Sequence, residues 1–489
     1  MLGEKVKLSA ITKEEYSEKI ETLRTKMAEL EQQVMREKIP VIVVFEGWGA
    51  AGKGSAIANL LGSMDPRGFS MNNIQPDSFD DRLFSFASKY GTKLPKYGEI
   101  GIFDRSWYRE MTRGLADRKP DEDSAEIAAE IITFFERQFV DDGGVIVKLF
   151  LNISKKEQKK RLEALASSKE TKWRATKRDF EQNKNYKMYA ECFDRMLERT
   201  NFPFAPWTVI DATDKRATAV KVYETVIASI SERLAEKPAA ISHASWFNTL
   251  PIESVRTIDP AAKVDPQEYK ERLKELKKRI DLLHNVIYKK RIPVIVCYEG
   301  WDAAGKGGNI KRLTSGMDPR GYEVFPIAAP DATEKAHHYL WRFAEKMPKA
   351  GHVAVFDRTW YGRVMVERIE GFCDEERWKQ AYEEMNEFEY GLWQWGAVIL
   401  KFFINIDNAE QLSRFEARRD TPDKQWKLTD EDWRNRDKWG AYEQAIDDML
   451  QKTNTDFAPW HIIQSTDKKY ARLQAMEAFI DAVEQRIGK

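Results

Sequence analysis

The stretch that decides the fold is IPVIVCYEGWDAAGK, residues 292–306, and a second version of it, IPVIVVFEGWGAAGK, occupies residues 39–53. The two versions lie 253 residues apart. The same offset pairs FDRSWY, starting at Phe103, with FDRTWY, starting at Phe356. Several motifs in one order at one fixed spacing indicate a duplication, so the chain contains two copies of one domain.

Within each copy, apolar runs alternate with amphipathic segments. Leucine and isoleucine recur at helical spacing ahead of the quoted stretch of the second copy, at Leu273, Leu276, Ile280, Leu283 and Ile287. Buried strands are predicted at 39–45, 101–103, 145–151 and 207–210, and again at 292–298, 353–356, 398–404 and 460–463. All-apolar strands separated by helices are typical of an α/β fold, a parallel sheet covered on both faces. We expect one domain over residues 1–235 and the other over 236–489.

Composition excludes several classes of partner. Lys and Arg together number 79, as do Asp and Glu, so no global field favours nucleic acid or a membrane surface. The three cysteines (Cys192, Cys297 and Cys373) are scattered and show no metal-ligand spacing. The charged start resembles no signal peptide, and no apolar run approaches the roughly 20 residues of a membrane helix. We expect a soluble cytoplasmic protein that binds neither nucleic acid nor membranes.

The Gly-rich turn of the second copy fits the P-loop pattern G-x-x-x-x-G-K between a strand and a helix. Small residues let backbone N–H groups converge on phosphate oxygens, and the lysine adds a point charge. The alternative interpretation is an ordinary Gly/Ala-rich connection. The predicted phosphate contacts in this turn are Gly300, Ala303, Ala304, Gly305, Lys306 and Gly307.

One position departs from the common P-loop. The Ser or Thr that usually follows the lysine and binds Mg²⁺ is Gly307 here. Another group must then hold the metal, and the available carboxylates are Asp302 in the loop and Asp357 at the end of a predicted strand. We therefore predict Asp302 and Asp357 as Mg²⁺ ligands.

Basic residues outside the loop supply further phosphate-binding candidates. Arg358 and Arg363 follow Asp357 closely and could neutralise a transferring phosphoryl group, although Asp–Arg is also a common structural pair. A basic stretch over residues 414–438 occupies the place of a mobile lid, and within it Arg418 and Lys427 are the candidates. Most other charges of that stretch are expected on a solvated helix face. Arg320, in the turn MDPRG, is a further phosphate-binding candidate.

These motifs resemble the polyphosphate kinase 2 family, and specifically its tandem-domain members. The residues that carry the resemblance are EGWDAAGKGG (299–308), LWR (340–342), FDRTWYGR (356–363) with Glu367 after it, and the APW that ends at Trp460. The family implies a thymidylate kinase-like fold with a helical lid. It also implies Mg²⁺-dependent transfer of a phosphoryl group from inorganic polyphosphate to a nucleotide, for tandem members mostly AMP to ADP. The resemblance assigns catalysis to Asp302, Lys306, Asp357, Arg358 and Arg418, and nucleotide binding to Glu367.

The constant offset allows the two copies to be compared position by position. Gly49 stands where the second copy has Asp302, and Leu165 stands where it has Arg418. Lys53 remains. Since the backbone cradle needs neither the acid nor the arginine, the first copy should fold but lack activity, and we predict that the second copy carries the chemistry.

Three alternatives remain at this level. An ATP-dependent nucleotide kinase would share the sheet and the loop, although Gly307 argues against it. A polyphosphate kinase that acts on nucleoside diphosphates would share every motif. A scaffold protein without activity would fit the first copy better than the second. Oligomeric state, nucleobase preference, reaction direction and polyphosphate length are left open.

Overall fold

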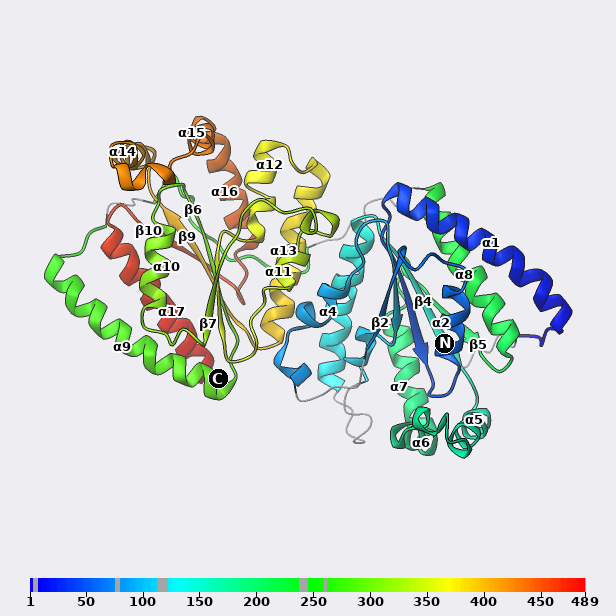
Figure 1. Ribbon diagram of the computed structural model, residues 1–489. Coiled ribbons are helices and arrows are strands. Elements are labelled where there is room, and N and C mark those ends of the chain that lie inside the picture. Colours follow the sequence, from blue (N-terminus) through cyan, green and yellow to red (C-terminus); the bar gives the residue numbers. More distant parts are fainter. Residues whose placement is uncertain (3–7, 75–79, 113–121, 237–244, 259–261, 489) are drawn as a thin grey trace. The chain divides into compact units, whose positions relative to one another are not determined.

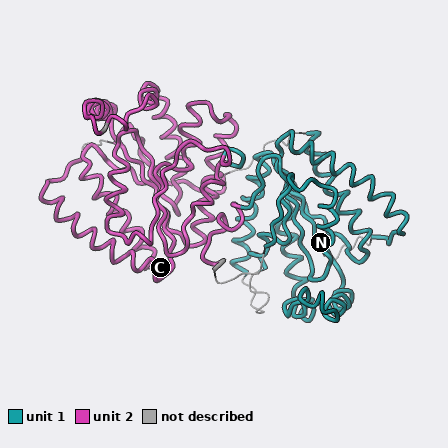
Figure 2. The backbone as a smooth tube through the Cα atoms, viewed as in Figure 1, with its two compact units in different colours: residues 1–76, 93–242, 335–338 teal, residues 77–92, 243–334, 339–489 magenta. Residues whose placement is uncertain are grey.

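The computed structural model describes the chain except residues 3–7, 75–79, 113–121, 237–244, 259–261 and 489. The chain forms two compact units, shown in different colours in Figure 2. Unit 1 comprises residues 1–76, 93–242 and 335–338, and unit 2 comprises residues 77–92, 243–334 and 339–489.

Each unit is built on a five-stranded parallel sheet (Figure 1). The strands of unit 1 are β1 (Val41–Gly47), β2 (Phe69–Asn73), β3 (Ile100–Asp104), β4 (Val145–Asn152) and β5 (Trp207–Asp211). Those of unit 2 are β6 (Val294–Gly300), β7 (Tyr322–Pro326), β8 (Val353–Asp357), β9 (Val398–Asn405) and β10 (Trp460–Gln464). The spatial orders β2-β3-β1-β4-β5 and β7-β8-β6-β9-β10 are the same, so the duplication extends to the topology. The predicted parallel α/β fold is confirmed.

Helices cover both faces of each sheet. The helices in the first half of the chain are α1 (Lys13–Glu37), α2 (Lys53–Leu61), α3 (Phe86–Tyr90), α4 (Glu122–Asp141), α5 (Lys155–Ser167), α6 (Lys177–Lys184), α7 (Tyr186–Arg199) and α8 (Lys215–Ala235). Those in the second half are α9 (Pro266–Lys290), α10 (Lys306–Thr314), α11 (Trp341–Ala344), α12 (Val366–Glu370), α13 (Glu375–Gln394), α14 (Asn408–Arg419), α15 (Asp430–Asp437), α16 (Trp439–Thr453) and α17 (Lys468–Gly488). In unit 2, α10 and α17 contact the sheet on one face with α9 packed on α17, and α13 contacts β9 from the other face (Figure 1).

Short 3-10 turns complete the described elements. They are η1 (Asp80–Leu83), η2 (Gly91–Lys93), η3 (Trp107–Arg109), η4 (Lys172–Arg174), η5 (Glu334–Ala336), η6 (Trp360–Arg363) and η7 (Pro422–Lys427).

The central strands explain why the quoted stretch decides the fold. Six of the seven residues of β6 are buried, as is expected of a strand that has neighbours on both sides and helices on both faces. Its register pairs Tyr298 with Asp357 of β8 and Gly300 with Ile404 of β9. The Gly-rich loop and the end of β8 therefore meet at one edge of the sheet, where ligands bind in open α/β folds.

Sequence patterning missed the edge strands β2 and β7. Their residues are half-buried or exposed, and their sequences FSMNN and YEVFP carry polar side chains or proline. An edge strand needs neither an apolar face on both sides nor every N–H donor, so its sequence lacks the continuous apolar run of a central strand.

The segment before α9 belongs to unit 2 and packs against α13. Phe247 contacts the rings of Tyr390 and Phe457 at centroid distances of 5.2 and 5.4 Å. The neighbouring Trp246 is 56% exposed. Among the described residues, no helix has both the length and the apolar character required to cross a membrane.

Candidate functional site

The P-loop of unit 2 connects β6 to α10 through a backbone that its small residues permit. Gly300 has φ 143°, and a Cβ there would overlap the backbone of Ile404. Ala303 (φ 60°) and Gly305 (φ 109°) then turn the chain so that α10 begins at Lys306. The first N–H groups of a helix have no partner inside the helix, which makes this end of α10 a ready site for phosphate oxygens.

The ammonium group of the P-loop lysine is hydrogen-bonded to the backbone of its own loop. Lys306 Nζ donates to the carbonyl oxygens of Gly300 at 2.6 Å and Trp301 at 3.2 Å. These bonds use two of the three N–H donors of the ammonium and fix where its charge lies.

Arg414 supports the loop from the side of α14. Its guanidinium donates to the carbonyl oxygens of Ala303 at 2.9 Å and Ala304 at 2.8 Å, and to that of Ser465 at 2.6 Å. The side chain is 7% exposed and also pairs with Glu410 at 2.6 Å. The first arginine of the basic stretch is therefore a brace for the loop backbone, a role that its charge alone did not reveal.

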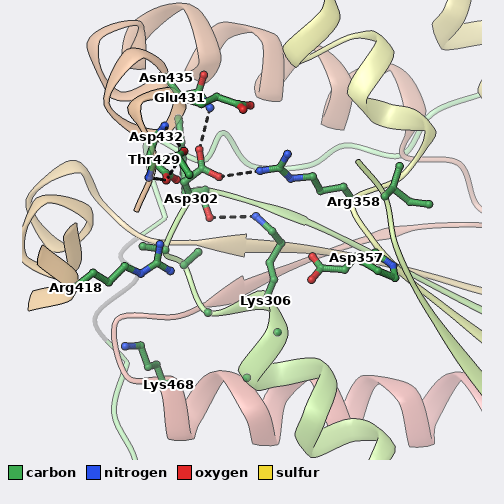
Figure 3. Close-up of a pocket in the computed structure, with 18 of the residues that line it drawn as sticks. Asp302, Lys306, Asp357, Arg358, Arg418, Thr429, Glu431, Asp432, Asn435 and Lys468 are labelled. Carbon is green, nitrogen blue, oxygen red and sulfur yellow. Dashed lines mark hydrogen bonds and ion pairs between the residues drawn. The ribbon is translucent and has the colours of Figure 1, made fainter. Parts of the chain in front are cut away.

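A cavity of about 600 Å³ opens over the P-loop (Figure 3). The residues predicted to do the chemistry all line it: Asp302, Lys306, Asp357, Arg358 and Arg418. So do the predicted phosphate contacts Ala303, Ala304, Gly305 and Gly307. Gly300 lines a smaller cavity of about 90 Å³ that adjoins the loop. The fold thus gathers side chains from the loop, from the end of β8 and from α14 in one place.

Asp302 is held between two elements. Its Oδ1 lies 3.5 Å from Nη2 of Arg358, and its Oδ2 accepts a hydrogen bond from Nδ2 of Asn435 at 3.0 Å. Arg358 has φ 68°, a left-handed conformation that is costly for a residue with a Cβ and that directs its side chain after β8 ends. Burial alone would lower the pKa of Arg358, but the carboxylates of Asp302 and Glu299 outweigh it and raise the pKa.

Glu299 joins the P-loop strand to the turn that follows β8. Its Oε1 accepts hydrogen bonds from N and Oγ1 of Thr359, both at 2.7 Å. Burial raises the pKa of this carboxyl, while the hydrogen bonds from Thr359 and the charge of Lys306 oppose the rise. The repeated EGW triplet was a signal for this residue, because Glu46 binds Ser106 in the same way in unit 1.

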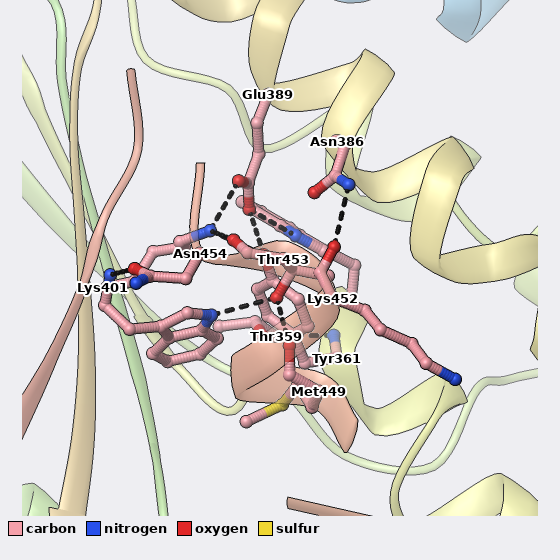
Figure 4. Close-up of polar contacts among 11 residues, drawn as sticks. Thr359, Tyr361, Asn386, Glu389, Lys401, Met449, Lys452, Thr453 and Asn454 are labelled. Atoms are coloured by element: carbon pink, nitrogen blue, oxygen red, sulfur yellow. Dashed lines mark hydrogen bonds and ion pairs between the residues drawn. The ribbon is translucent and has the colours of Figure 1, made fainter. Parts of the chain in front are cut away.

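The Trp and Tyr of the FDRTWY motif form polar contacts in the core of unit 2 (Figure 4). Trp360 Nε1 donates to Glu389 at 3.1 Å, and the hydroxyl of Tyr361 donates to the same carboxylate at 2.6 Å. Lys401 completes a fully buried ion pair with Glu389 at 2.8 Å and donates to the carbonyl of Thr453 at 2.6 Å. The motif therefore divides, with Asp357 and Arg358 facing the cavity and the next aromatic pair anchored in the core.

Four predicted ligand-binding residues lie elsewhere or cannot be placed. Arg320 is paired with Asp318 at 2.7 Å and is 89% exposed, outside the cavity lining. Arg363 pairs with Glu367 at 2.7 Å, and neither lines the cavity. Lys427 ends η7, and its side chain lies outside the described part of the structure.

Sequence reasoning missed several polar residues of the cavity wall. These are Thr429, Glu431, Asp432 and Asn435 from the start and end of α15, and Lys468 and Arg472 from α17. Arg472 could have been found, since the offset pairs it with an alanine, Ala219. Asn435 gave no signal, because an uncharged amide on a polar helix resembles any solvated residue.

In unit 1, side chains of α6 lie against the equivalent loop. The N–H of Gly49 donates to Oε1 of Gln182 on α6 at 2.8 Å. A Cβ at Gly49 would overlap the carboxylate of Asp179 on the same helix. Lys53 donates to Gly47 and Trp48 as Lys306 does to its own loop, so the cradle persists without the acid.

The carboxylates of the cavity suit a hard cation that shares a phosphate ligand. Among the described residues, no group of three or more His, Cys, Asp or Glu side chains gathers to enclose a metal by itself. Mg²⁺ is commonly held by one or two carboxylates together with substrate phosphates and water. Asp302 and Asp357, which line one cavity beside the N-terminus of α10, fit that pattern.

Comparison with known proteins identifies close relatives of the whole chain. A family model described as polyphosphate kinase 2 matches residues 10–238 and 263–488. The chain is 35% identical to the polyphosphate:AMP phosphotransferase of Pseudomonas aeruginosa over 98% of each chain, and 34% identical to that of Pseudomonas syringae pv. tomato over 98% of this chain and 97% of the relative. A crystal structure described as polyphosphate kinase 2 from Pseudomonas aeruginosa PA01 superposes with a TM-score of 0.85 at 33% identity, over 98% of each chain. The resemblance inferred from the motifs is confirmed.

Proposed function

This chain belongs to the polyphosphate kinase 2 family, and we propose that it transfers a phosphoryl group from inorganic polyphosphate to AMP, forming ADP. The observation that carries the proposal is the gathering of Asp302, Lys306, Asp357, Arg358 and Arg418 around one cavity of about 600 Å³ over the P-loop. Relatives that share almost the full length are named for the same transfer.

The residues would act by position and charge. Lys306 and the N-terminus of α10 bind the terminal phosphates of the polyphosphate. Arg358 and Arg418 neutralise charge on the phosphoryl group during its transfer. An oxygen of the AMP phosphate, already anionic near neutral pH, forms the new bond to phosphorus. The bond from that phosphorus to the bridging oxygen breaks, and the polyphosphate leaves one unit shorter. The reaction is reversible in principle and needs no strong general base.

Mg²⁺ would be held by Asp302 and Asp357, and when bound it supplies charge neutralisation to the phosphate oxygens. The two acids come from different elements, the loop after β6 and the end of β8. Their positions therefore depend on the braces formed by Glu299 and Glu389.

We assign the reaction to unit 2. Unit 1 keeps the lysine but has Gly49 and Leu165 in place of the acid and the lid arginine. Its loop also donates its Gly49 N–H to Gln182. A structural or regulatory role for unit 1 is the corresponding proposal.

A panel of donors and acceptors tests the substrate assignment. AMP, GMP, ADP and GDP are each supplied with polyphosphate or ATP in the presence of Mg²⁺. We expect AMP with polyphosphate to give the highest kcat/KM, and Lys306→Ala to abolish that turnover. Faster transfer from ATP would replace this proposal with a nucleotide kinase, and faster transfer to ADP would replace the acceptor.

A further inference from the structure

Helix α15, which lies in the basic stretch predicted to form the lid, contacts Asp302 of the loop through Asn435. Asn435 Nδ2 donates to Oδ2 of Asp302 at 3.0 Å, and the hydroxyl of Tyr442 on α16 donates to Oδ1 of Asn435 at 3.2 Å. Figure 3 shows Asn435 above Asp302, with Arg358 to the right of the carboxylate. Asp302 therefore contacts both α15 and the residue that follows β8.

The orientation of the Asn435 amide follows from its partners. A carboxylate accepts and cannot donate, so it faces the NH₂ group, and the carbonyl end is left to accept from Tyr442. Burial raises the pKa of Tyr442, and the carboxylates of Glu370 and Asp302 add to the rise, which keeps the phenol protonated as a donor. Tyr442 therefore locks the amide in the orientation that suits Asp302.

The lid helix is itself fixed to α14 at the next residue. Arg436 donates to Oδ1 of Asn408 at 2.6 Å, to the carbonyl of Asn408 at 2.8 Å and to Oε1 of Gln411 at 3.1 Å. Gln411 in turn donates to the backbone carbonyl of Asp302 at 3.2 Å. The position of Asn435 is consequently set by packing, since two helices and the loop share this one network.

Unit 1 supplies an internal comparison. Gln182 occupies the position of Asn435, and Gly49 that of Asp302. There the amide presents its oxygen, which accepts from the N–H of Gly49 and from Nε2 of Gln158, both at 2.8 Å. Each lid residue matches its own loop: a donor faces a carboxylate in unit 2, and an acceptor faces a bare amide in unit 1. A side chain retained only for helix solubility would show no such match.

We propose that Asn435, oriented by Tyr442, is a positioning residue that prepares Asp302 for the cation bound with the phosphate chain. This inference rests on the proposed function. One N–H bond to Oδ2 fixes the rotamer of Asp302 and leaves lone pairs on both carboxylate oxygens for a metal. Because Asn435 lies on α15, the orientation of the Asp302 carboxylate depends on the position of that helix.

Binding of Mn²⁺ to the full-length chain in the presence of inorganic phosphate, which can supply the phosphate ligand, and without nucleotide or polyphosphate tests the inference. Free Mn²⁺ is measured by electron paramagnetic resonance. We expect Asn435→Ala to weaken binding by about 10- to 100-fold, the usual cost of losing an outer-shell partner. Tyr442→Phe should weaken it less, and Gln182→Ala, the matched change in unit 1, should leave it unchanged. Wild-type affinity in Asn435→Ala, or no Mn²⁺ binding by the wild-type chain, would overturn the inference.

A double-mutant cycle separates positioning from a general structural defect. If Asn435 acts through Asp302, Asn435→Ala should cause no further loss of Mn²⁺ binding in an Asp302→Asn background. Additive losses would contradict the inference. In turnover assays, Asn435→Ala should raise the Mg²⁺ concentration that gives half the maximal rate, and excess Mg²⁺ should restore kcat, whereas a misfolded lid would lower the rate at every Mg²⁺ concentration. The Mn²⁺ titration requires no phosphate donor, so its outcome is independent of the donor panel.

Discussion

The P-loops of the two units share one backbone and differ in what they offer a ligand. Ala50 and Ala303 both have φ 60°, and each loop ends in a left-handed glycine before its lysine. Each lysine returns to the carbonyls at the end of its own strand. In unit 2 the loop also carries the Asp302 carboxylate, whereas in unit 1 the Gly49 N–H is bonded to a lid glutamine.

The comparison separates the residues that form the backbone of the loop from those whose side chains would contact a ligand. The glycines, the lysine and the buried carboxylate near the end of the strand (Glu46 and Glu299) are common to both copies, because the turn and the sheet edge require them. The loop acid and the lid arginine differ, and a backbone does not need them to fold. Loss of such groups removes ligand chemistry without removing the domain.

The largest expected effect concerns the two lysines. Lys306→Ala should reduce turnover of AMP with polyphosphate by at least about 10³-fold, because in the proposed mechanism this lysine binds the terminal phosphates of the donor. Asp302→Asn should have a similar effect, whereas Lys53→Ala should retain most of the activity. Initial rates at saturating substrate provide the measurement. A greater loss in Lys53→Ala would reverse the assignment of the active unit.

The buried ion pairs sharpen the comparison. Lys148 pairs with Glu136 in unit 1 as Lys401 pairs with Glu389 in unit 2, both at 2.8–2.9 Å and fully buried. Lys401→Met and Lys148→Met should each destabilise their own unit by about 3–5 kcal/mol, because an unpaired carboxylate stays buried. Hydrogen exchange followed by mass spectrometry reports each unit separately.

The two variants should differ in activity. At a temperature where both are folded, Lys401→Met should lower kcat, since Glu389 also anchors the turn that carries Asp357 and Arg358. Lys148→Met should leave kcat near the wild-type value. Equal losses would mean that unit 1 contributes to catalysis.

The pH dependence of stability gives a third contrast. Burial lowers the pKa of Lys53 to about 8, whereas the unfolded chain titrates near its usual value of about 10.4. Between these values the unfolded state holds a proton that the folded state has released, so the free energy of unfolding rises with pH. Relative to Lys53→Met, the wild-type chain should gain up to about 3 kcal/mol between pH 8 and 10.5. Denaturant unfolding at several pH values measures the difference, and parallel pH profiles would contradict the burial of this ammonium.

The smallest expected effect tests whether the missing loop carboxylate is the only reason that unit 1 lacks activity. Gly49→Asp should destabilise unit 1 by about 1–3 kcal/mol, because its Cβ would overlap Asp179. In a Lys306→Ala background it should restore no turnover. Gly54→Ala is the control, since a Cβ there meets no atom within 4 Å. Recovery of activity in Gly49→Asp would show that the missing acid alone silences unit 1.

Local patterns predicted the central strands and the loop because their signals lie within a few residues. Residues 292–306 show an apolar run and a Gly-rich turn whatever the rest of the chain does. The edge strand at 322–326 was missed because its partner on one side, and not its own sequence, makes it a strand. Arg363 was expected at the phosphates, but it ends η6 and pairs with Glu367 at the start of α12.

The sequence by itself determined the duplication, the parallel α/β class and the asymmetry between Asp302 and Gly49. Those follow from residue identity and spacing, which set charge, backbone freedom and local periodicity. Only the tertiary structure decided that Arg414 braces the loop and that Asn435 faces the loop acid. These roles depend on which atoms are brought within hydrogen-bond distance by packing between elements more than 100 residues apart, and no local pattern encodes that distance.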